Sequence, residues 1–237
     1  MRVTFLAHDG FLIELNTVCL LFDWWKEPIP PLPDKPLLVL ISHRHEDHFN
    51  PEVFTLAERK ADIQFLLGSD FHLLSRNLEK WRLTPEAAAK CRRCGKHDVF
   101  QPLPAVTVET FPSTDEGVAW MVTAEDKAIF HAGDLNWWHW AEEGDAWNRN
   151  MEANFKRYTE PLRGRRADLA MLPLDPRLGS GGDLGPDYFL GLMDVRRFFP
   201  MHQWDHFEFT DEFLKRYPQF APITVKIHHN LETFQLD

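Results

Sequence analysis

Short apolar runs rich in β-branched and aromatic residues recur through the first half of the chain. They predict strands at residues 2–7, 11–15, 18–22, 37–41, 63–67, 106–111, 118–124 and 127–131. Helices are expected at 51–59, where Asn50-Pro51 supplies the cap and first turn, and at 70–80 and 150–160. Further on, strands at 168–172 and 197–201 alternate with helices that open at residues 185–187 and 210–211. The pattern predicts a mixed α/β (α+β) fold of two strand-led halves with helices outside.

A dense group of metal-binding side chains follows the buried run at 37–41. The residues are His43-Arg44-His45-Glu46-Asp47-His48. Because side chains alternate along a strand, His43 and His45 leave its end on one side, and Asp47 and His48 follow where the backbone must turn. Imidazole and carboxylate together suit zinc, iron or manganese, and four ligands so close in sequence can be shared between two ions. The alternative is a polar loop that is rich in histidine by chance.

The pattern His-x-His-x-Asp-His after a buried strand resembles the metallo-β-lactamase superfamily. Three further segments match it in family order. Residues 4–14 with 20–23 resemble the first hairpin of the branch that contains the L-ascorbate phosphate lactonases. Residues 129–134 resemble the strand that ends in a Gly-Asp pair, and 199–202 resemble the late strand that supplies the last histidine.

This resemblance implies a four-layer αββα sandwich, formed here by one domain over residues 1–237. It also implies one metal held by His43 and His45, a second held by Asp47, His48 and His202, and Asp134 shared between them. One or two divalent ions are expected, with zinc ahead of Mn²⁺ or Fe²⁺. The implied activity is metal-dependent hydrolysis, in which hydroxide held by Asp47 and Asp134 attacks an ester, lactone or phosphoester bond of a small molecule.

One element of the family pattern is missing. The family usually places another histidine between the first cluster and the Gly-Asp strand, and residues 111–120 contain none. Asp115 offers the best available carboxylate for the metal bound by His43 and His45. The alternative is that Asp115 forms an Asx-type turn before the next strand, and the sequence does not decide between the two.

An aromatic segment at residues 135–140 follows Asp134 immediately, so Trp137 and His139 are predicted to contact the substrate. Core packing is the alternative for any single tryptophan. Asp175 is predicted to orient a ligand histidine, whereas His8 is interpreted as a structural histidine outside the ligand set. The glycine-rich residues 177–185 are interpreted as an active-site loop, with a plain surface connection as the alternative.

Composition narrows the remaining function classes. A net charge of −10 disfavours a general nucleic-acid binder, and the longest apolar runs are too short to cross a membrane. With no recognisable export signal and only three cysteines, we expect a cytoplasmic protein without a disulfide framework. Cys91 and Cys94 form a lone C-x-x-C, either a small zinc or redox site or two reduced thiols. The alternative functions are a nuclease or phosphodiesterase and a metal-binding member without catalysis.

Overall fold

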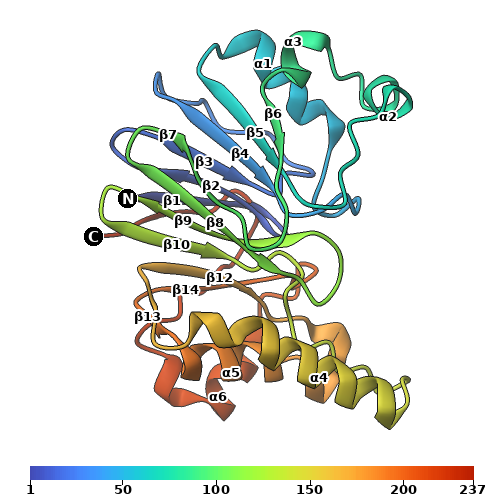
Figure 1. Ribbon diagram of the computed structural model, residues 1–237. Coiled ribbons are helices and arrows are strands. Elements are labelled where there is room, and N and C mark those ends of the chain that lie inside the picture. Colours follow the sequence, from blue (N-terminus) through green and yellow to red (C-terminus); the bar gives the residue numbers. More distant parts are fainter.

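Two β-sheets lie face to face in the computed structural model, which describes residues 1–237 (Figure 1). The first sheet has the order β15-β1-β2-β3-β4-β5-β6, with β15 (Thr233–Gln235), β1 (Arg2–Ala7), β2 (Gly10–Glu14), β3 (Cys19–Phe22), β4 (Leu37–Ile41), β5 (Ile63–Leu67) and β6 (Cys91–Arg93). The second has the order β14-β12-β10-β9-β8-β7, with β14 (Phe198–Met201), β12 (Leu169–Pro173), β10 (Lys127–His131), β9 (Val118–Ala124), β8 (Val106–Pro112) and β7 (Val99–Leu103). A separate ladder pairs β11 (Arg166–Ala167) with β13 (Asp194–Val195).

Helices cover the outer surfaces of both sheets (Figure 1). The first sheet carries α1 (Leu56–Arg59), α2 (Ser75–Lys80) and α3 (Pro85–Ala88), and the second carries α4 (Asp145–Thr159), α5 (Leu184–Leu192) and α6 (Phe209–Arg216). Short 3-10 segments occupy Pro51–Thr55, Glu160–Leu162, Pro176–Gly181 and Pro218–Phe220. None of these helices combines the length and apolar character that a membrane span needs. The predicted four-layer αββα sandwich is confirmed.

Strand β4 shows how the apolar pattern builds the layers. Leu38 and Leu40 belong to the core between the two sheets, whereas Leu37, Val39 and Ile41 belong to the core beneath α1, α2 and α3. Successive side chains of a strand point to opposite faces, so an uninterrupted apolar run fits a strand that is buried on both sides. Burial of each such side chain contributes roughly 1.5–3 kcal/mol. The segment that follows β4 therefore starts from a firmly packed position.

The sequence prediction located most of the sheet framework. The strands expected at 2–7, 37–41, 63–67, 118–124 and 127–131 have those bounds in the structure. Short or edge strands were missed, including β6 with three residues and β7, which contains Pro102. The helix expected at 70–80 begins only at Ser75, because the preceding segment buries Phe71 against Phe49 and Trp81.

A glycine fixes the end of β4 against the opposite sheet. Gly117, just before β9, has φ +71°, and its backbone approaches Ser42, the residue before His43. A Cβ atom at Gly117 would lie 1.9 Å from the Ser42 carbonyl oxygen and 2.7 Å from the Cβ atom of His43. The next residue, Val118, donates its N–H to the same carbonyl at 3.1 Å. Only glycine fits this contact between the sheets.

Replacing Gly117 with alanine should therefore lower the free energy of unfolding by roughly 2 kcal/mol or more, because it adds both a backbone clash and an unfavourable φ. Urea denaturation measures the change. Gly191→Ala is the matched control, since Gly191 lies in α5 with no atom within 4 Å of its Cβ direction. That variant should be as stable as the wild type or slightly more stable. Equal stability of the two variants would contradict the proposed contact.

Candidate metal centre

Three histidines from strand ends and the adjoining turn present the same nitrogen, Nε2, toward Asp134. His43 and His48 follow β4, and His202 follows β14. Nδ1 of His43 lies 2.9 Å from the Ser42 hydroxyl, Nδ1 of His48 lies 2.9 Å from Asp23, and Nδ1 of His202 lies 2.8 Å from Asp175. When each Nδ1–H donates to its oxygen, each Nε2 keeps a lone pair for a metal ion.

Buried carboxylates hold these rings in place. Asp23 accepts hydrogen bonds from the Ser42 N–H at 2.7 Å and the Ser42 hydroxyl at 2.5 Å, in addition to His48. Asp175 accepts from Arg177 Nη2 at 2.6 Å while it holds His202. Asp175 thus contacts the candidate ligand His202, as its predicted orienting role requires, whereas Asp23 was not predicted. Both carboxylates limit the directions in which the histidine Nε2 atoms can point.

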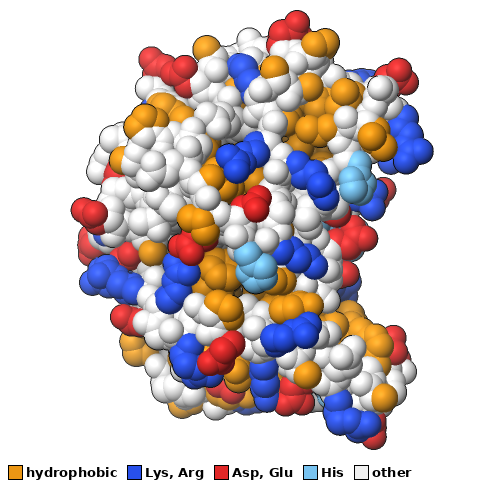
Figure 2. Space-filling model, in the orientation of Figure 1, with side chains coloured by type: hydrophobic (Ala, Val, Ile, Leu, Met, Phe, Trp, Pro, Cys, Tyr) orange, Lys and Arg blue, Asp and Glu red, His pale blue; other side chains and the backbone are white.

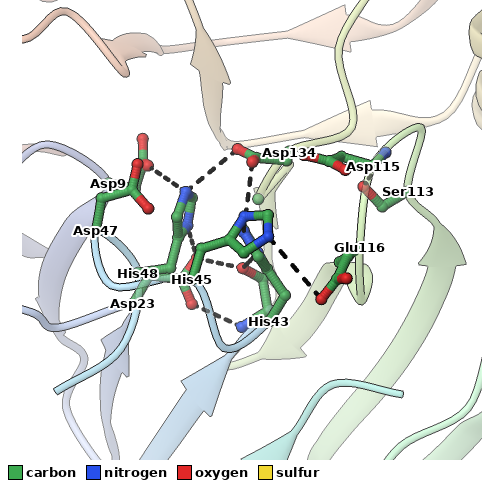
Figure 3. A network of polar contacts seen from close by, with 12 residues as sticks. Asp9, Asp23, His43, His45, Asp47, His48, Ser113, Asp115, Glu116 and Asp134 are labelled. Carbon is green, nitrogen blue, oxygen red and sulfur yellow. Dashed lines mark hydrogen bonds and ion pairs between the residues drawn. The ribbon is translucent and has the colours of Figure 1, made fainter. Parts of the chain in front are cut away.

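A group of buried donor atoms meets between the two sheets (Figure 3). Nε2 of His48 lies 3.0 Å from an oxygen of Asp9 and 3.2 Å from Oδ1 of Asp134, and Nε2 of His202 lies 3.4 Å from that Oδ1. These atoms are buried and none has a hydrogen-bond partner. A tetrahedral ion with ligands at 2.0–2.2 Å would place them roughly 3.3–3.6 Å apart. The observed spacing therefore fits one cation.

A second group of donors adjoins the first through Asp134. Nε2 of His43 lies 3.3 Å from Oδ2 of Asp134 and 3.0 Å from Nδ1 of His45. Donor atoms of His45, Asp115 and Asp134 also lie within 4.8 Å of one another. Because Oδ1 of Asp134 faces His48 and His202 while Oδ2 faces His43, this carboxylate has the geometry of a bridge between two ion positions.

The carboxylate of Asp115 is free to serve as a ligand. Its backbone N–H donates to the hydroxyl of Ser113 at 3.1 Å, so Ser113 caps this turn, and the Asp115 carboxylate makes no hydrogen bond. The alternative of an Asx-type turn formed by Asp115 is therefore wrong. Partial burial and the charge of Asp134 raise the pKa of Asp115 above its usual value. Asp115 thus lies with the donor atoms of His45 and Asp134.

Asp9, for which the sequence analysis predicted no role, lies among the donor atoms, whereas Asp47, a predicted ligand, does not. Asp47 lies outside all three groups of close donor atoms, with Oδ2 3.4 Å from Nε2 of His8. Asp9 lies inside, in a buried group with His8, His48 and His202. The sequence prediction missed Asp9. It also interpreted His8 as a structural histidine outside the ligand set, whereas a ring nitrogen of His8 lies within this donor group. The sequence feature that could have indicated Asp9 is the pair His8-Asp9 before Gly10, because two ionisable residues at a turn between apolar strands are unusual.

Negative charge is concentrated at the centre. Burial alone would raise the pKa of Asp134, but the charges of His48 and His43 outweigh it and hold the pKa well below the usual value. Burial would lower the pKa of His48, yet Asp134 and Asp9 raise it well above the usual value. Burial likewise opposes the rise in the pKa of His202, which Asp9 drives. An environment that attracts protons to these nitrogens also attracts a divalent cation.

A cavity of about 350 Å³ opens onto the centre. Its aromatic wall consists of Trp138, Trp140 and Trp147. Neither Trp137 nor His139, the residues predicted to contact substrate, lines it. The indole of Trp138 donates to the Asp134 carbonyl at 3.0 Å and so turns toward the centre, whereas Trp137 packs against Phe155 and Tyr188. The aromatic segment therefore contributes Trp138 and Trp140 to the cavity, and not the predicted Trp137 and His139.

The lone C-x-x-C lies away from this centre. Cys91 is in β6 at the edge of the first sheet, and Cys94 follows it. Burial raises the pKa of each thiol to about 12, which leaves both protonated and unreactive at neutral pH. Neither belongs to a group of donors close enough to hold a metal ion. The structure favours two reduced thiols here.

Comparison with known proteins identifies the family. A family model described as the beta-lactamase superfamily domain matches residues 2–146, more than half of the chain. This chain belongs to the metallo-β-lactamase superfamily. A "UPF0173 metal-dependent hydrolase" of Desulforamulus reducens is 37% identical over 67 residues, which make up 27% of this chain and 29% of that protein. The match thus spans less than a third of this curated relative.

Solved structures share the metallo-β-lactamase fold along the whole chain. Igni18, a metallo hydrolase from Ignicoccus hospitalis, is 16% identical with a TM-score of 0.64, over 100% of this chain and 99% of the other. CmlA, a diiron β-hydroxylase from Streptomyces venezuelae, is 10% identical with a TM-score of 0.65, over 99% of this chain and 54% of the other. At these identities the likeness concerns the fold alone.

Asp115→Asn tests whether this carboxylate serves the position beside His43 and His45. We expect a metal titration to show one ion bound as in the wild type and the other weakened by roughly 10-fold or more, because an amide oxygen is a poorer ligand without charge. Glu116→Gln is the control, since Glu116 lies beside His45 outside every donor group. Wild-type affinity at both positions in Asp115→Asn would reject Asp115 as a ligand.

Proposed function

We propose that this chain is a metal-dependent hydrolase with two neighbouring ion positions. His43, His45 and Asp115 would hold one ion, Asp9, His48 and His202 the other, and Asp134 would bridge them. The observation that carries the proposal is the set of buried, unpaired donors on Asp9, His48, Asp134 and His202 at ligand spacing. This assignment replaces Asp47 by Asp9 in the ligand set that the sequence predicted.

The donor set suits divalent ions that accept nitrogen and oxygen ligands. It contains imidazoles and carboxylates and no thiolate, a combination compatible with zinc, iron or manganese. We propose zinc, with Mn²⁺ or Fe²⁺ as alternatives, and the diiron name of CmlA shows iron in one protein of this fold. Three carboxylates, those of Asp9, Asp115 and Asp134, would offset most of the charge of two divalent ions.

Residues at the cavity supply the remaining chemistry. A bound divalent ion contributes a Lewis acid and an activated water at neutral pH. Asp47 lines the cavity with its side chain 22% exposed, and one oxygen faces His8. Burial would raise the pKa of Asp47, but the neighbouring His8 and the charge of His48 hold it below the usual value. We infer that Asp47 stays ionised and accepts a proton from water on the cavity side.

We propose a small substrate with an ester, lactone or phosphoester bond. Its volume of about 350 Å³ lies at the lower end of ligand pockets, which span roughly 300–1,000 Å³. The resemblance to the L-ascorbate phosphate lactonase branch supports the same class. A nuclease is the less favoured alternative, because the net charge is −10 and acidic and basic side chains are interspersed on the face that Figure 2 shows.

Asp134→Ala tests the function directly. Because Asp134 faces both donor groups, this variant should lose most bound metal and all hydrolysis of a panel of an ester, a lactone and a phosphodiester, assayed with zinc, manganese and iron. Elemental analysis and product formation measure the two effects. Asp187→Ala, on α5 outside the donor groups, is the control and should keep the wild-type metal content.

Measurements on the wild-type protein can contradict the proposed hydrolase function. Less than one ion per chain, together with no hydrolysis of any panel member, would favour a metal-binding member without catalysis over the proposed hydrolase. Metal content and activity that survive in Asp134→Ala would remove Asp134 from the centre.

A further inference from the structure

Arg177 is a cationic side chain in the wall of the metal cavity. It lies in the 3-10 segment Pro176–Gly181, two residues after the N-cap residue Asp175 and at the start of the predicted active-site loop. Its side chain is 44% exposed. Among the residues that line the cavity it is the sole lysine or arginine, and it also lines a neighbouring cavity of about 610 Å³. The side chain therefore stands where a small molecule can reach it.

The hydrogen bonds of Arg177 occupy one edge of its guanidinium group. Nε donates to Asp175 at 3.0–3.1 Å and Nη2 donates at 2.6 Å, whereas Nη1 has no hydrogen-bond partner. A guanidinium carries five N–H donors in a rigid fork, so one edge can hold Asp175 while the other remains free. Because Asp175 already fixes the plane, a ligand at Nη1 would meet an ordered donor.

Aromatic rings reinforce this orientation. The central carbon of the Arg177 guanidinium lies 4.4 Å from the ring centre of Trp204 and 5.7 Å from that of Trp140. Trp140 and Trp138 have planes within 8° of parallel and lie on the cavity wall. Ring faces attract a cation, and they also exclude water, which strengthens an ionic hydrogen bond at the free edge.

Arg177 also lies close to a histidine of the candidate metal centre. Nη2 lies 3.5 Å from Nδ1 of His202, whose Nε2 belongs to the donor group. Arg177 therefore lies beside a histidine of the donor group and lines the same cavity as Asp134 and His202. Asp175 balances the charge of Arg177, but it is fully buried and already accepts from His202, so it does not compete for the free edge.

We propose that Arg177, between Trp140 and Trp204, is an anion-binding subsite, and that the substrate carries a carboxylate or phosphate group in addition to the bond that is hydrolysed. The charged group on the substrate rests on the proposed hydrolase function, whereas the anion-binding subsite does not. The small cavity limits the molecule to a compact one with an apolar or planar body against the tryptophans. Carboxylate and phosphate both present anionic oxygens in pairs, which the N–H donors along an arginine edge recognise.

Calorimetric titration of the metal-loaded protein with benzoate, phenylphosphonate and neutral benzyl alcohol tests the subsite without relying on catalysis, because none of the three has a bond that the proposed hydrolase would cleave. We expect an anion to bind more tightly than benzyl alcohol, and Arg177→Gln to weaken that anion by roughly 10-fold or more. Arg177→Lys should restore part of the loss, because it keeps the charge without the fork. A preference between benzoate and phenylphosphonate identifies which anion the substrate carries.

Arg149→Gln is the charge-matched control, since Arg149 is 71% exposed on α4 and lines neither cavity. It should bind the anion within about twofold of the wild type, because a single exposed charge is screened. The metal content of Arg177→Gln is measured in parallel. Unchanged anion affinity in Arg177→Gln, or a loss that parallels a loss of metal, would overturn the subsite and leave Arg177 as a residue that positions Asp175 and His202.

These results are distinguishable from failure of the hydrolase proposal. A wild-type protein that binds the anions through Arg177 and hydrolyses no panel member would retain the subsite and refute the hydrolase. If hydrolysis is observed, the ratio of kcat/KM for an ester with a carboxylate to kcat/KM for its neutral analogue should fall roughly 10-fold or more in Arg177→Gln. An unchanged ratio would refute Arg177 as a determinant of specificity.

Discussion

The structure depends on one electrostatic constraint, the burial of polar atoms on Asp9, His48, Asp134 and His202 that have no hydrogen-bond partner. A buried polar atom left unsatisfied costs roughly 1–3 kcal/mol, and charged groups cost more. Several such atoms around one point would place a heavy penalty on folding unless a cation joined them. Their mutual spacing matches the ligands of a single ion, so the arrangement is best understood as a coordination shell.

The fold supports this shell from both sheets. β4 delivers His43 and His48, β10 leads to Asp134, and β14 leads to His202. Asp23 and Asp175 fix the ring orientations through Nδ1, and Gly117 permits the close approach of the two sheets at Ser42. The apolar cores on both faces of β4 make its end a rigid platform, which is what a site with narrow distance requirements needs.

Much of the candidate centre was predictable from sequence because its potential ligands sit in local patterns. The spacing of His43, His45 and His48 after an apolar run, and the resemblance at Asp134 and His202, located most donors. The pair His8-Asp9 marks Asp9 as unusual in the sequence, but its place in the donor group instead of Asp47 depends on how the turn between β1 and β2 meets the other strand ends, which local sequence does not give. The choice of Trp138 over Trp137 at the cavity likewise follows from tertiary packing, which local sequence does not encode.

The most direct test of this account is anomalous diffraction from crystals of the zinc-loaded protein, recorded on both sides of the zinc absorption edge. We expect two adjacent peaks, with Asp134 between them, roughly 3.5–4 Å apart. One of them should have an oxygen of Asp9 in its coordination shell, at roughly 2.0–2.2 Å, together with His48 and His202. A zinc ion coordinated by His48 and His202 with Asp47 in that place, or no peak between these histidines, would contradict it.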